Sequence, residues 1–442
     1  MSALSCLDEY SWTGEFWLPE KRDKRFSGTL RYSPSEGIVL SYLLVVEDFS
    51  AEQSPVLHGV LDSGHPCSLL DGFRTNNAGI SYIGGITTRA GRCAFSFLVL
   101  GGFVEQSDTF DQIKFRLPSL EEFFFPSTSE QDVSYSSLPI LSAEMDSARF
   151  TLLNQGTFNP IFSGFENRFH SRDENALKAL VEALQRVRSQ YPNGQFSYRK
   201  KLEYWAYLDF AQHCGVTEAC KKVTEICDLF AMLRYLPTYP AEVKVSNRQS
   251  DGTVSTFDVL QSLILAPRTV ELLLRTPHHF DLAINARNTA LGDVISKWSL
   301  SRATLGAVVS SIQNETGLRD LHEALGDIVL FATQFESISY SANQKKCKYV
   351  YPITTYACSL LANRLSTIFG KVHCTDVGAG VSDLRNDIAH VARPKKLLPL
   401  LSLRDLVAIG QCLQLTVLAY ELRSIGIDAE HTDRFQERIL AQ

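Results

Sequence analysis

The sequence contains no segment of eighteen or more consecutive apolar residues, which argues against a membrane-spanning helix. Its first residues, MSALSCLDEY, also lack the basic start and following apolar run that are typical of a secretory signal. We therefore expect a protein that works in the cytoplasm and has no membrane partner.

The ten cysteines include no C-x-x-C pair, the spacing most typical of zinc ribbons and redox centres. Buried, reduced thiols are the favoured interpretation, and no metal is expected. A zinc site built from Cys347, Cys358 and the adjacent His373-Cys374 pair is a less favoured alternative. The Gly84-Gly85 and Gly101-Gly102 pairs fit neither G-x-G-x-x-G nor G-x4-G-K-[ST]. They are predicted to be turns, and no nucleotide cofactor is expected.

The chain also lacks an excess of positive charge. Its 442 residues carry a formal net charge of −6 with a pI near 6.0, and 45% of them are hydrophobic and 21% charged. These values are those of an ordinary globular protein long enough for several domains. They argue against a surface that coats nucleic acid, but they leave room for a local basic patch.

Residues 1–160 are predicted to form a β-rich domain. Short apolar segments are separated there by glycine, proline and asparagine, which is the pattern of strands joined by turns. Their density favours a sandwich or a partly closed barrel. The segments expected as strands are Arg25–Tyr32, Ile38–Val46, Gly59–Leu61, Ile80–Ile86, Cys93–Leu100 and Ser147–Phe158.

Residues 161–315 are predicted to form a helical middle domain. Apolar residues at helical spacing form one face of a helix that Pro192-Asn193-Gly194 ends, at Leu177, Leu180, Val181, Leu184 and Val187. Further helices are expected over Leu202–Phe210 and Val223–Leu236, and again from Phe257 and from Leu291. Val243–Val254 is expected to be a brief extended segment.

Residues 316–442 are predicted to form an up-and-down bundle of four helices. Along the first helix, apolar residues recur at alternating spacings of three and four, at Leu318, Leu321, Leu325, Ile328, Ala332 and Phe335. Such a seam requires a long helical neighbour. Three more helices are expected over Thr354–Phe369, Val381–Val391 and Ser402–Ile425. The predicted fold class is therefore multidomain α+β.

The third of these helices carries the strongest functional signal. Its sequence V-S-D-L-R-N-D-I-A-H places apolar residues on one side and Arg385, Asn386 and His390 elsewhere on its surface. Ser382-Asp383 is expected to begin this helix and Arg393-Pro394 to end it. The Arg-x4-His register occurs once in the chain.

The segment R-N-D-I-A-H, Arg385 to His390, resembles the signature of the HEPN superfamily, which is Arg-x4-His with a polar residue often placed directly after the Arg. Near the other end, G-E-F-W-L-P (Gly14–Pro19) and S-G-T-L-R-Y-S-P (Ser27–Pro34) resemble the N-terminal domain of the ApeA family. That family joins such a domain to a C-terminal HEPN domain and is associated with bacterial antiphage defence. The resemblance thus implies a HEPN-type bundle over 316–442.

The resemblance implies a metal-independent endoribonuclease. RNA supplies its own 2′-OH nucleophile and phosphodiester, so the protein has to move protons and stabilise a charged phosphate. The imidazole of His390 suits proton transfer near neutral pH, and the guanidinium of Arg385 suits phosphate oxygens. Asn386 can orient the imidazole or the RNA.

RNA cleavage uses a general base and a general acid, and the motif supplies a single histidine for both roles. In the family resembled two HEPN domains pair, so a homodimer with a composite site is expected. Arg393, Lys395 and Lys396 are candidate RNA contacts, and a solvated cluster at a helix end is an equally good interpretation of them. The analogy also suggests transfer RNA as substrate, abortive infection as outcome and a phage-derived trigger sensed by the preceding domains.

Two further possibilities stay open. A non-catalytic HEPN protein that binds RNA, nucleotides or a partner protein as a scaffold is the alternative function. Glu336 lies off the seam of the first bundle helix and is a weaker candidate for the cleft, with a plain surface charge as the favoured interpretation.

Overall fold

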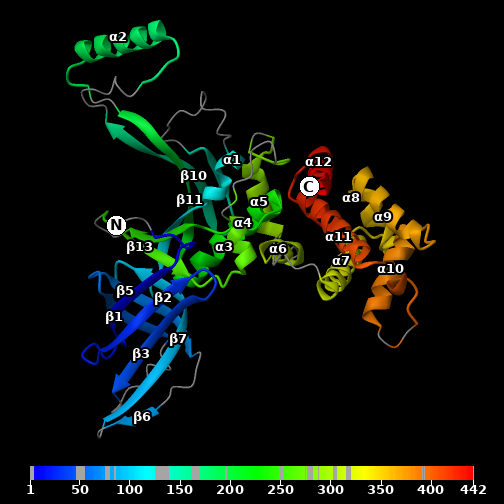
Figure 1. Ribbon diagram of the computed structural model, residues 1–442, viewed down its shortest axis with the longest axis horizontal. Helices are drawn as coiled ribbons and strands as arrows, with labels where there is room; N and C mark the ends of the chain where they lie inside the picture. Colours follow the sequence, from blue (N-terminus) through cyan, green and yellow to red (C-terminus); the bar gives the residue numbers. More distant parts are fainter. Residues whose placement is uncertain are drawn as a thin grey trace.

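The β-rich and helical parts of the chain follow one another across the molecule, and the last helices form a separate cluster at one end (Figure 1). The computed structural model describes residues 4–45, 55–74, 80–83, 86–124, 139–160, 169–194, 197–248, 252–273, 275, 282–286, 288–301, 306–314, 320–390, 392 and 394–441.

Within the described residues, six strands close into a barrel. The side chains of Phe16, Leu30 and Leu40 are fully buried in its core, because alternate residues of a strand face opposite sides of a sheet. A pairing between the first and last strands of the row closes the ring, so the barrel is more complete than predicted. The hydrogen-bonded order is β3 (Gly37–Val45), β2 (Phe26–Ser33), β1 (Tyr10–Trp17), β4 (Val56–Leu61), β5 (Pro66–Arg74) and β7 (Ile86–Leu100).

Strand β7 continues past the barrel and joins it to an open stretch of sheet. Thr88–Phe95 pairs with β3, and beyond it Phe97–Leu100 pairs with the next strand on the same sheet. The short β6 (Ile80–Ile83) also pairs with β7. The open stretch runs in the order β13 (Val254–Gln261), β12 (Glu242–Arg248), β8 (Phe110–Arg116), β11 (Ser197–Cys214), β10 (Ala148–Pro160) and β9 (Leu141–Glu144).

This open sheet corrects the prediction that residues 161–315 are helical. Leu202–Phe210, expected as a helix, belongs to β11, and Phe257, expected to begin a helix, lies in β13. The reason is visible in the burial of β11, where Tyr204, Ala206 and Leu208 are all buried at a spacing of two. Such a short apolar stretch fits both the helical and the strand repeat. It forms a strand here because it pairs with two neighbouring strands, β10 and β8.

Helices pack against the open sheet, α3 (Val216–Arg234) on β8 and α5 (Leu291–Ser301) on β9. The central one is α3, whose fully buried Phe230 touches two aromatic rings of α1 (Glu121–Phe124). The Trp298 indole N–H donates a hydrogen bond of 2.8 Å to a carbonyl of α3. The helix predicted from Leu291 is confirmed, and the one predicted over Val223–Leu236 is present but runs from Val216 to Arg234. The others are α4 (Pro267–Leu273), α5 (Leu291–Ser301) and α6 (Gly306–Gln313).

Helix α2 (Glu174–Gln190) lies on the connection between β10 and β11, beyond the tip of that hairpin (Figure 1). The predicted helix before Pro192 is thereby confirmed. No residue of α2 is buried, however, so its apolar residues are not part of the hydrophobic core.

The C-terminal part is helical, as predicted, but its described residues form six α-helices where four were predicted, and α7 packs mainly against α11. Ile328, Ala332 and Phe335 of the predicted seam are fully buried between them. Leu321 is 52% exposed, which corrects the start of the seam, and Leu318 lies outside the described residues. The helices are α7 (Leu321–Ser341), α8 (Val350–Tyr356), α9 (Ser359–Lys371), α10 (Val377–Ala389), α11 (Leu403–Ser424) and α12 (Ala429–Ala441).

The helix predicted over Thr354–Phe369 is broken into α8 and α9. Ala357 adopts extended backbone, with φ −85° and ψ 133°. The amide side chain of Gln436, from α12, accepts a 2.6 Å hydrogen bond from the Cys358 N–H and donates 2.9 Å bonds to the carbonyls of Tyr356 and Leu415. A residue about eighty positions away therefore stabilises the break, which is why helical periodicity alone did not predict it.

Among the described residues, α11 is the one helix with the length and apolar character to cross a bilayer. Its predicted bounds, Ser402 to Ile425, are confirmed, since Ser402 caps it and Ile425 ends it. Of its most apolar window, 72% is buried against the rest of the protein. Core packing therefore accounts for its composition, and the cytoplasmic location stays a prediction.

The bundle contacts the preceding helices through a small polar network. The Tyr235 hydroxyl donates a 2.6 Å hydrogen bond to Gln414 of α11, whose amide donates a 2.7 Å bond to Ser311 of α6. The ring of Tyr235 also meets Phe435 of α12 edge-on, at 6.5 Å between centroids. Seven residues beyond Gln414 along α11, burial raises the pKa of Glu421 to about 8. Side-chain contacts thus connect the bundle to the rest of the chain.

We expect Gly380→Ala to destabilise the protein, because a β-carbon at this position of α10 would lie 2.7 Å from the Phe369 ring of α9. Overpacking of this kind costs about 1–3 kcal/mol. Gly326→Ala is the matched control, since it adds a methyl group to a helix at a place with no atom within 4 Å. It should stabilise by about 0.5–1 kcal/mol. Urea unfolding of both variants measures the difference, and equal stabilities would contradict the close approach of α10 and α9.

Candidate functional site

Helix α10 carries the Arg-x4-His segment and is held closely by its neighbours. Val381 and Leu384 are fully buried on its inner side. Gly378 and Gly380 face Val350 and Phe369 at distances that leave no room for a β-carbon. Two glycines at a spacing of two therefore allow α10 to approach α8 and α9 more closely than other residues would.

Both predicted ends of this helix are corrected. The helix begins at Val377, because the Asp376 side chain accepts a 3.1 Å hydrogen bond from the Ala379 N–H as an N-cap; Ser382-Asp383 lies inside it. It ends at Ala389, and His390 is the capping residue with φ −115° and ψ 90°. His390 therefore leaves the helical path before the Arg393-Pro394 pair that was expected to end it.

The three predicted catalytic residues share this end of α10. Arg385 and Asn386 are half-buried and His390 is exposed. The Arg385 guanidinium donates a 3.4 Å hydrogen bond to the Asn386 side chain, and the His390 N–H donates to the Asn386 carbonyl at 3.1 Å. The Nε atom of Arg385 is buried without a hydrogen-bond partner among the described residues. Part of the guanidinium's donor capacity is thus unused.

An acidic residue lies beside Arg385. Glu336, from α7, accepts a hydrogen bond from the Tyr349 hydroxyl and a 2.9 Å bond from the Lys348 ammonium. Burial on its own would raise the pKa of Glu336, but these two donors and the positive charges of Lys348 and Arg385 outweigh it and lower the pKa. The carboxylate is therefore ionised at neutral pH and attracts Arg385. Glu336, the weaker candidate from the sequence, faces the same cluster.

Tyr349 completes the cluster and was not predicted from the sequence. Burial, followed by its hydrogen bond to Glu336, raises the pKa of this phenol. It precedes α8 and follows the single-turn helix η7 (Lys345–Cys347). The Lys345-Lys346-x-Lys348 run next to it was the one available signal, and Lys348 proves to be an ion-pair partner.

The end of α10 depends on Asp387, another residue that the sequence reading missed. Its buried carboxylate accepts hydrogen bonds from the backbone N–H groups of Lys396, Leu397 and Leu398, at 2.8, 2.7 and 3.0 Å. Burial would raise the pKa of Asp387, but these three donors and the nearby charge of Lys395 together hold it below its usual value. The available signal was its place three residues after Leu384, on the apolar side of the helix.

The predicted RNA-binding residues are partly used within the chain. The Lys395 ammonium donates to the carbonyls of Asp387 and His390, the latter at 2.9 Å. Lys396 pairs with Asp383 at 3.2 Å and keeps 68% of its side chain exposed. Arg393 lies outside the described residues. Of the two described lysines, Lys396 is therefore the more accessible.

The cysteines have no part in this site. All ten are free thiols, and seven of them are buried. In the described stretches of chain, no group of three or more His, Cys, Asp or Glu side chains could hold a metal ion. Cys347 is exposed and Cys358 is buried, so these two parts of the alternative zinc site differ in environment.

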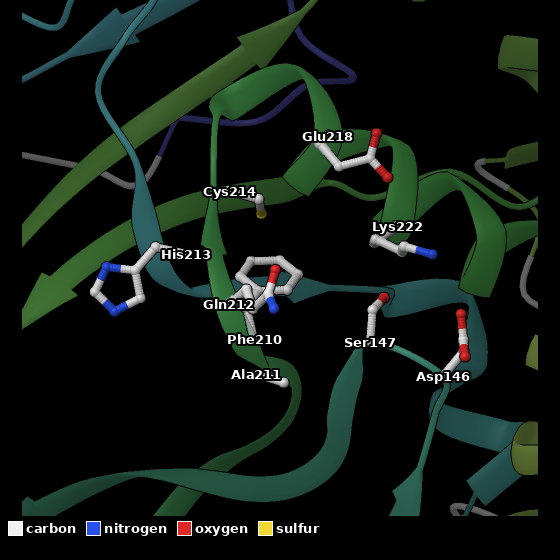
Figure 2. A pocket seen from close by; sticks show the side chains of 9 residues that line it. All are labelled: Asp146, Ser147, Phe210, Ala211, Gln212, His213, Cys214, Glu218 and Lys222. Carbon is white, nitrogen blue, oxygen red and sulfur yellow. The ribbon is translucent and has the colours of Figure 1, made fainter.

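A pocket of about 400 Å³ lies elsewhere, where β11 meets α3 (Figure 2). Cys214 points toward its centre, whereas His213 points away from the other labelled side chains. Burial, and then the charge of Glu218, raises the pKa of the Cys214 thiol to about 11, so it is protonated at neutral pH. Lys222 pairs with Glu225 at 3.1 Å. The pocket therefore offers no activated nucleophile.

The comparisons with known proteins address the N-terminal two thirds. The family model for ApeA N-terminal domain 1 matches residues 11–298, which is more than half of the chain. The chain belongs to the ApeA family. Membership supports a role in antiphage defence. No curated protein and no solved structure matches the chain.

The ApeA match runs through β1 to β13 and ends within α5, so it spans the predicted boundary at residue 160. The helices α7 to α12, which carry Arg385 and His390, lie outside it. For this ApeA-family protein, the geometry of α7, α8 and α10 is therefore the basis for any argument about the C-terminal site.

We expect Asp387→Asn to lower the free energy of unfolding by about 1–3 kcal/mol at neutral pH, because three backbone donors lose a charged acceptor. The folded-state pKa of Asp387 is lowered, so its contribution is fully present above its ordinary pKa of about 4 and is lost as the pH falls through the lower folded value. The difference between variant and wild type should therefore shrink in acid.

Denaturant unfolding at pH 7 and at several acid pH values measures this difference. Asp383→Asn is the control from the same helix, one turn earlier. It removes only an exposed ion pair with Lys396 and should change stability by at most about 0.5 kcal/mol. A penalty for Asp387→Asn that is independent of pH would contradict the assigned role of the charge.

Proposed function

We propose that this ApeA-family protein is a metal-independent endoribonuclease of the HEPN type, acting in antiphage defence by cutting RNA and stopping growth. Transfer RNA is the substrate class that family analogy suggests. The observation that carries the proposal is the gathering of Arg385, Asn386 and His390 at the exposed end of α10, with the imidazole open to solvent.

The chemistry follows from these groups. His390 takes a proton from the 2′-OH or delivers one to the leaving 5′ oxygen. The 2′ oxygen then attacks the adjacent phosphorus and the P–O5′ bond breaks, which leaves a 2′,3′-cyclic phosphate and a 5′-hydroxyl. Arg385 stabilises the extra negative charge on the phosphate. The nucleophile and the leaving group both belong to the RNA, so only protons are exchanged with the protein.

A second copy of the protein would supply the second imidazole that a single site lacks. One imidazole cannot act as acid and base at the same instant, so we propose a homodimer in which two α10 ends face one cleft. The exposed position of His390, at the end of its helix, suits such a pairing. Lys396 would then contact a flanking phosphate.

Glu336 is assigned a positioning role. Its ionised carboxylate lies beside Arg385 and is fixed by Tyr349 and Lys348. It limits the positions of the guanidinium in the absence of RNA, and a bound phosphate would compete with it for the same positive charge.

The surroundings of Arg385 also suit the alternative function. A guanidinium that is half-buried, bonded to Asn386 and close enough to Glu336 for their charges to interact is what a structural arginine in a non-catalytic RNA-binding or protein-interaction scaffold would show. The alternative predicts that Arg385→Ala weakens binding or assembly, while wild-type protein never cuts RNA.

We expect His390→Ala to reduce RNA cleavage by about 10²–10⁴-fold, the usual contribution of general acid–base catalysis. His322→Ala is the control, since His322 is an exposed histidine near the start of α7. The assay uses purified full-length protein and structured RNA, with product ends analysed for 2′,3′-cyclic phosphate. Equal rates for the His390 variant and wild type, or cleavage that depends on added Mg²⁺, would contradict the nuclease.

Glu336→Gln should reduce cleavage by about tenfold, which corresponds to about 1.4 kcal/mol, because the amide keeps the hydrogen bonds but loses the charge that orients Arg385. In an Arg385→Ala background the same change should have no further effect. Cleavage rates of the two single variants and the double variant complete the cycle. Additive losses would show that Glu336 does not act through Arg385.

A further inference from the structure

The pocket where β11 meets α3 has no part in the proposed nuclease (Figure 2). Its lining residues come from the turn between β9 and β10, from the end of β11 and from the first two turns of α3. None of them belongs to the helices α7 to α12. Its volume of about 400 Å³ is in the range of sites for small molecules.

The ladder between β11 and β8 is interrupted at this pocket. Asp209 pairs with Gln112 and Cys214 pairs with Phe110, so four residues of β11 stand opposite one residue of β8. All four of these residues, Phe210 to His213, line the pocket. A bulge redirects the side chains of its strand, and bulges are common next to functional sites. The irregularity in β11 therefore shapes the pocket wall.

The turn between β9 and β10 is fixed against this bulge. The Met145 N–H donates a 2.8 Å hydrogen bond to the Ala148 carbonyl and closes the turn, and the Ala211 N–H donates a 3.1 Å bond to the Ser147 carbonyl. Asp146 and Ser147 are thereby held beside the bulge by backbone contacts. The wall of the pocket is thus built from main chain that is bonded in place.

Carboxylates dominate the charges of the lining. Asp146 is exposed and has no ion-pair or hydrogen-bond partner among the described residues. Glu218 meets Lys221 at a long 3.8 Å, and half of its side chain is exposed. The Lys222 ammonium is engaged by Glu225 at 3.1 Å. The negative charges of Asp146 and Glu218 are therefore only partly neutralised within the chain.

The Cys214 thiol, which points toward the centre of the pocket, shows which sign of charge prevails there. Burial raises its pKa most, and the negative charge of Glu218 raises it further, by more than the positive charge of Lys222 lowers it. The imidazole of His213 points away from the other labelled side chains. The interior of the pocket thus favours a positive charge.

The Phe210 ring gives the pocket an apolar surface. It is half-buried and lies near the middle of the labelled side chains, whereas the carboxylates of Asp146 and Glu218 come from two different elements around it (Figure 2). An aromatic ring packs against methylene groups, and its face also attracts a cation. A ligand with both features would match all three residues.

We propose that this pocket binds a small organic cation, whose ammonium groups pair with Asp146 and Glu218 and whose methylene chain packs on the Phe210 ring. A phosphate or carboxylate compound fits less well, because it would meet two carboxylates. The site lies on the helix that contacts the bundle, since α3 ends at Tyr235, which donates its hydrogen bond to Gln414. Binding there is independent of RNA cleavage.

Titration calorimetry of the full chain with spermidine, a linear triamine, tests the proposal. We expect one site per chain with a dissociation constant of about 1 mM or tighter. Asp146→Asn and Glu218→Gln should each weaken binding by about fivefold, as loss of an accessible ion pair does. Both residues are exposed, so these variants should fold, and circular dichroism confirms it.

Glu144→Gln is the matched control, because the chain has a net charge of −6 and attracts spermidine non-specifically as well. Glu144 is an exposed residue of β9 outside the pocket, paired with Arg149 at 3.4 Å, and its variant should bind like the wild type. Absence of binding, or equal affinities for Glu144→Gln, Asp146→Asn and Glu218→Gln, would overturn the proposal.

Two further ligands test the class of compound. The uncharged 1,8-octanediol, which has the same chain length as spermidine, should bind much more weakly, and equal affinity would overturn the role of charge. The peptide Gly-Lys-Gly presents the same ammonium chemistry as a side chain. It should also bind more weakly than spermidine, and a preference for the peptide would overturn the assignment to a free small molecule. Phe210→Leu should weaken spermidine binding while leaving the fold intact.

Discussion

The candidate site depends on the carboxylate of Asp387. A buried carboxylate is costly unless hydrogen bonds satisfy it, and here three successive backbone N–H groups do so. This requirement fixes the segment after α10 against the helix end. It also brings Lys395 to the last carbonyls of α10, so that His390 leaves the helix and stays exposed. The position of the imidazole thus follows from an interaction in which it takes no part.

A second constraint acts from the other side of α10. The glycines at 378 and 380 allow the helix to lie directly on α8 and α9, and this close approach brings Arg385 to Glu336 and Tyr349. The resulting cluster combines an ionised carboxylate, a guanidinium whose Nε has no hydrogen-bond partner among the described residues, and an exposed imidazole a turn away. The proposed role of Arg385 in binding phosphate rests on this positive charge.

The region matched by the ApeA family model and the candidate catalytic residues are different parts of the chain. The matched region holds the barrel, the open sheet, α3 and the helices before α6, whereas α6 and the candidate catalytic residues follow it in the chain. The two are connected through Tyr235, Gln414 and Ser311. A change in the position of α3 or α6 would therefore reach α11, the central helix of the bundle, by direct contact.

The sequence alone determined those helices and strands whose capping residues or apolar spacing are distinctive. Ser402 and Asp405 form a capping box, so the start of α11 was predictable, and the alternating segments of the barrel were predictable as strands. The Arg-x4-His spacing likewise singled out Arg385, Asn386 and His390 as candidate residues, and their catalytic role stays a prediction. Tertiary structure decided the rest. Leu202–Phe210 is a strand because β10 and β8 pair with it, and the break before α9 exists because Gln436 satisfies it. Tyr349, Glu336 and Asp387 gained their roles from neighbours distant in sequence, and the hydrogen bonds and charges that define those roles arise only when the helices pack.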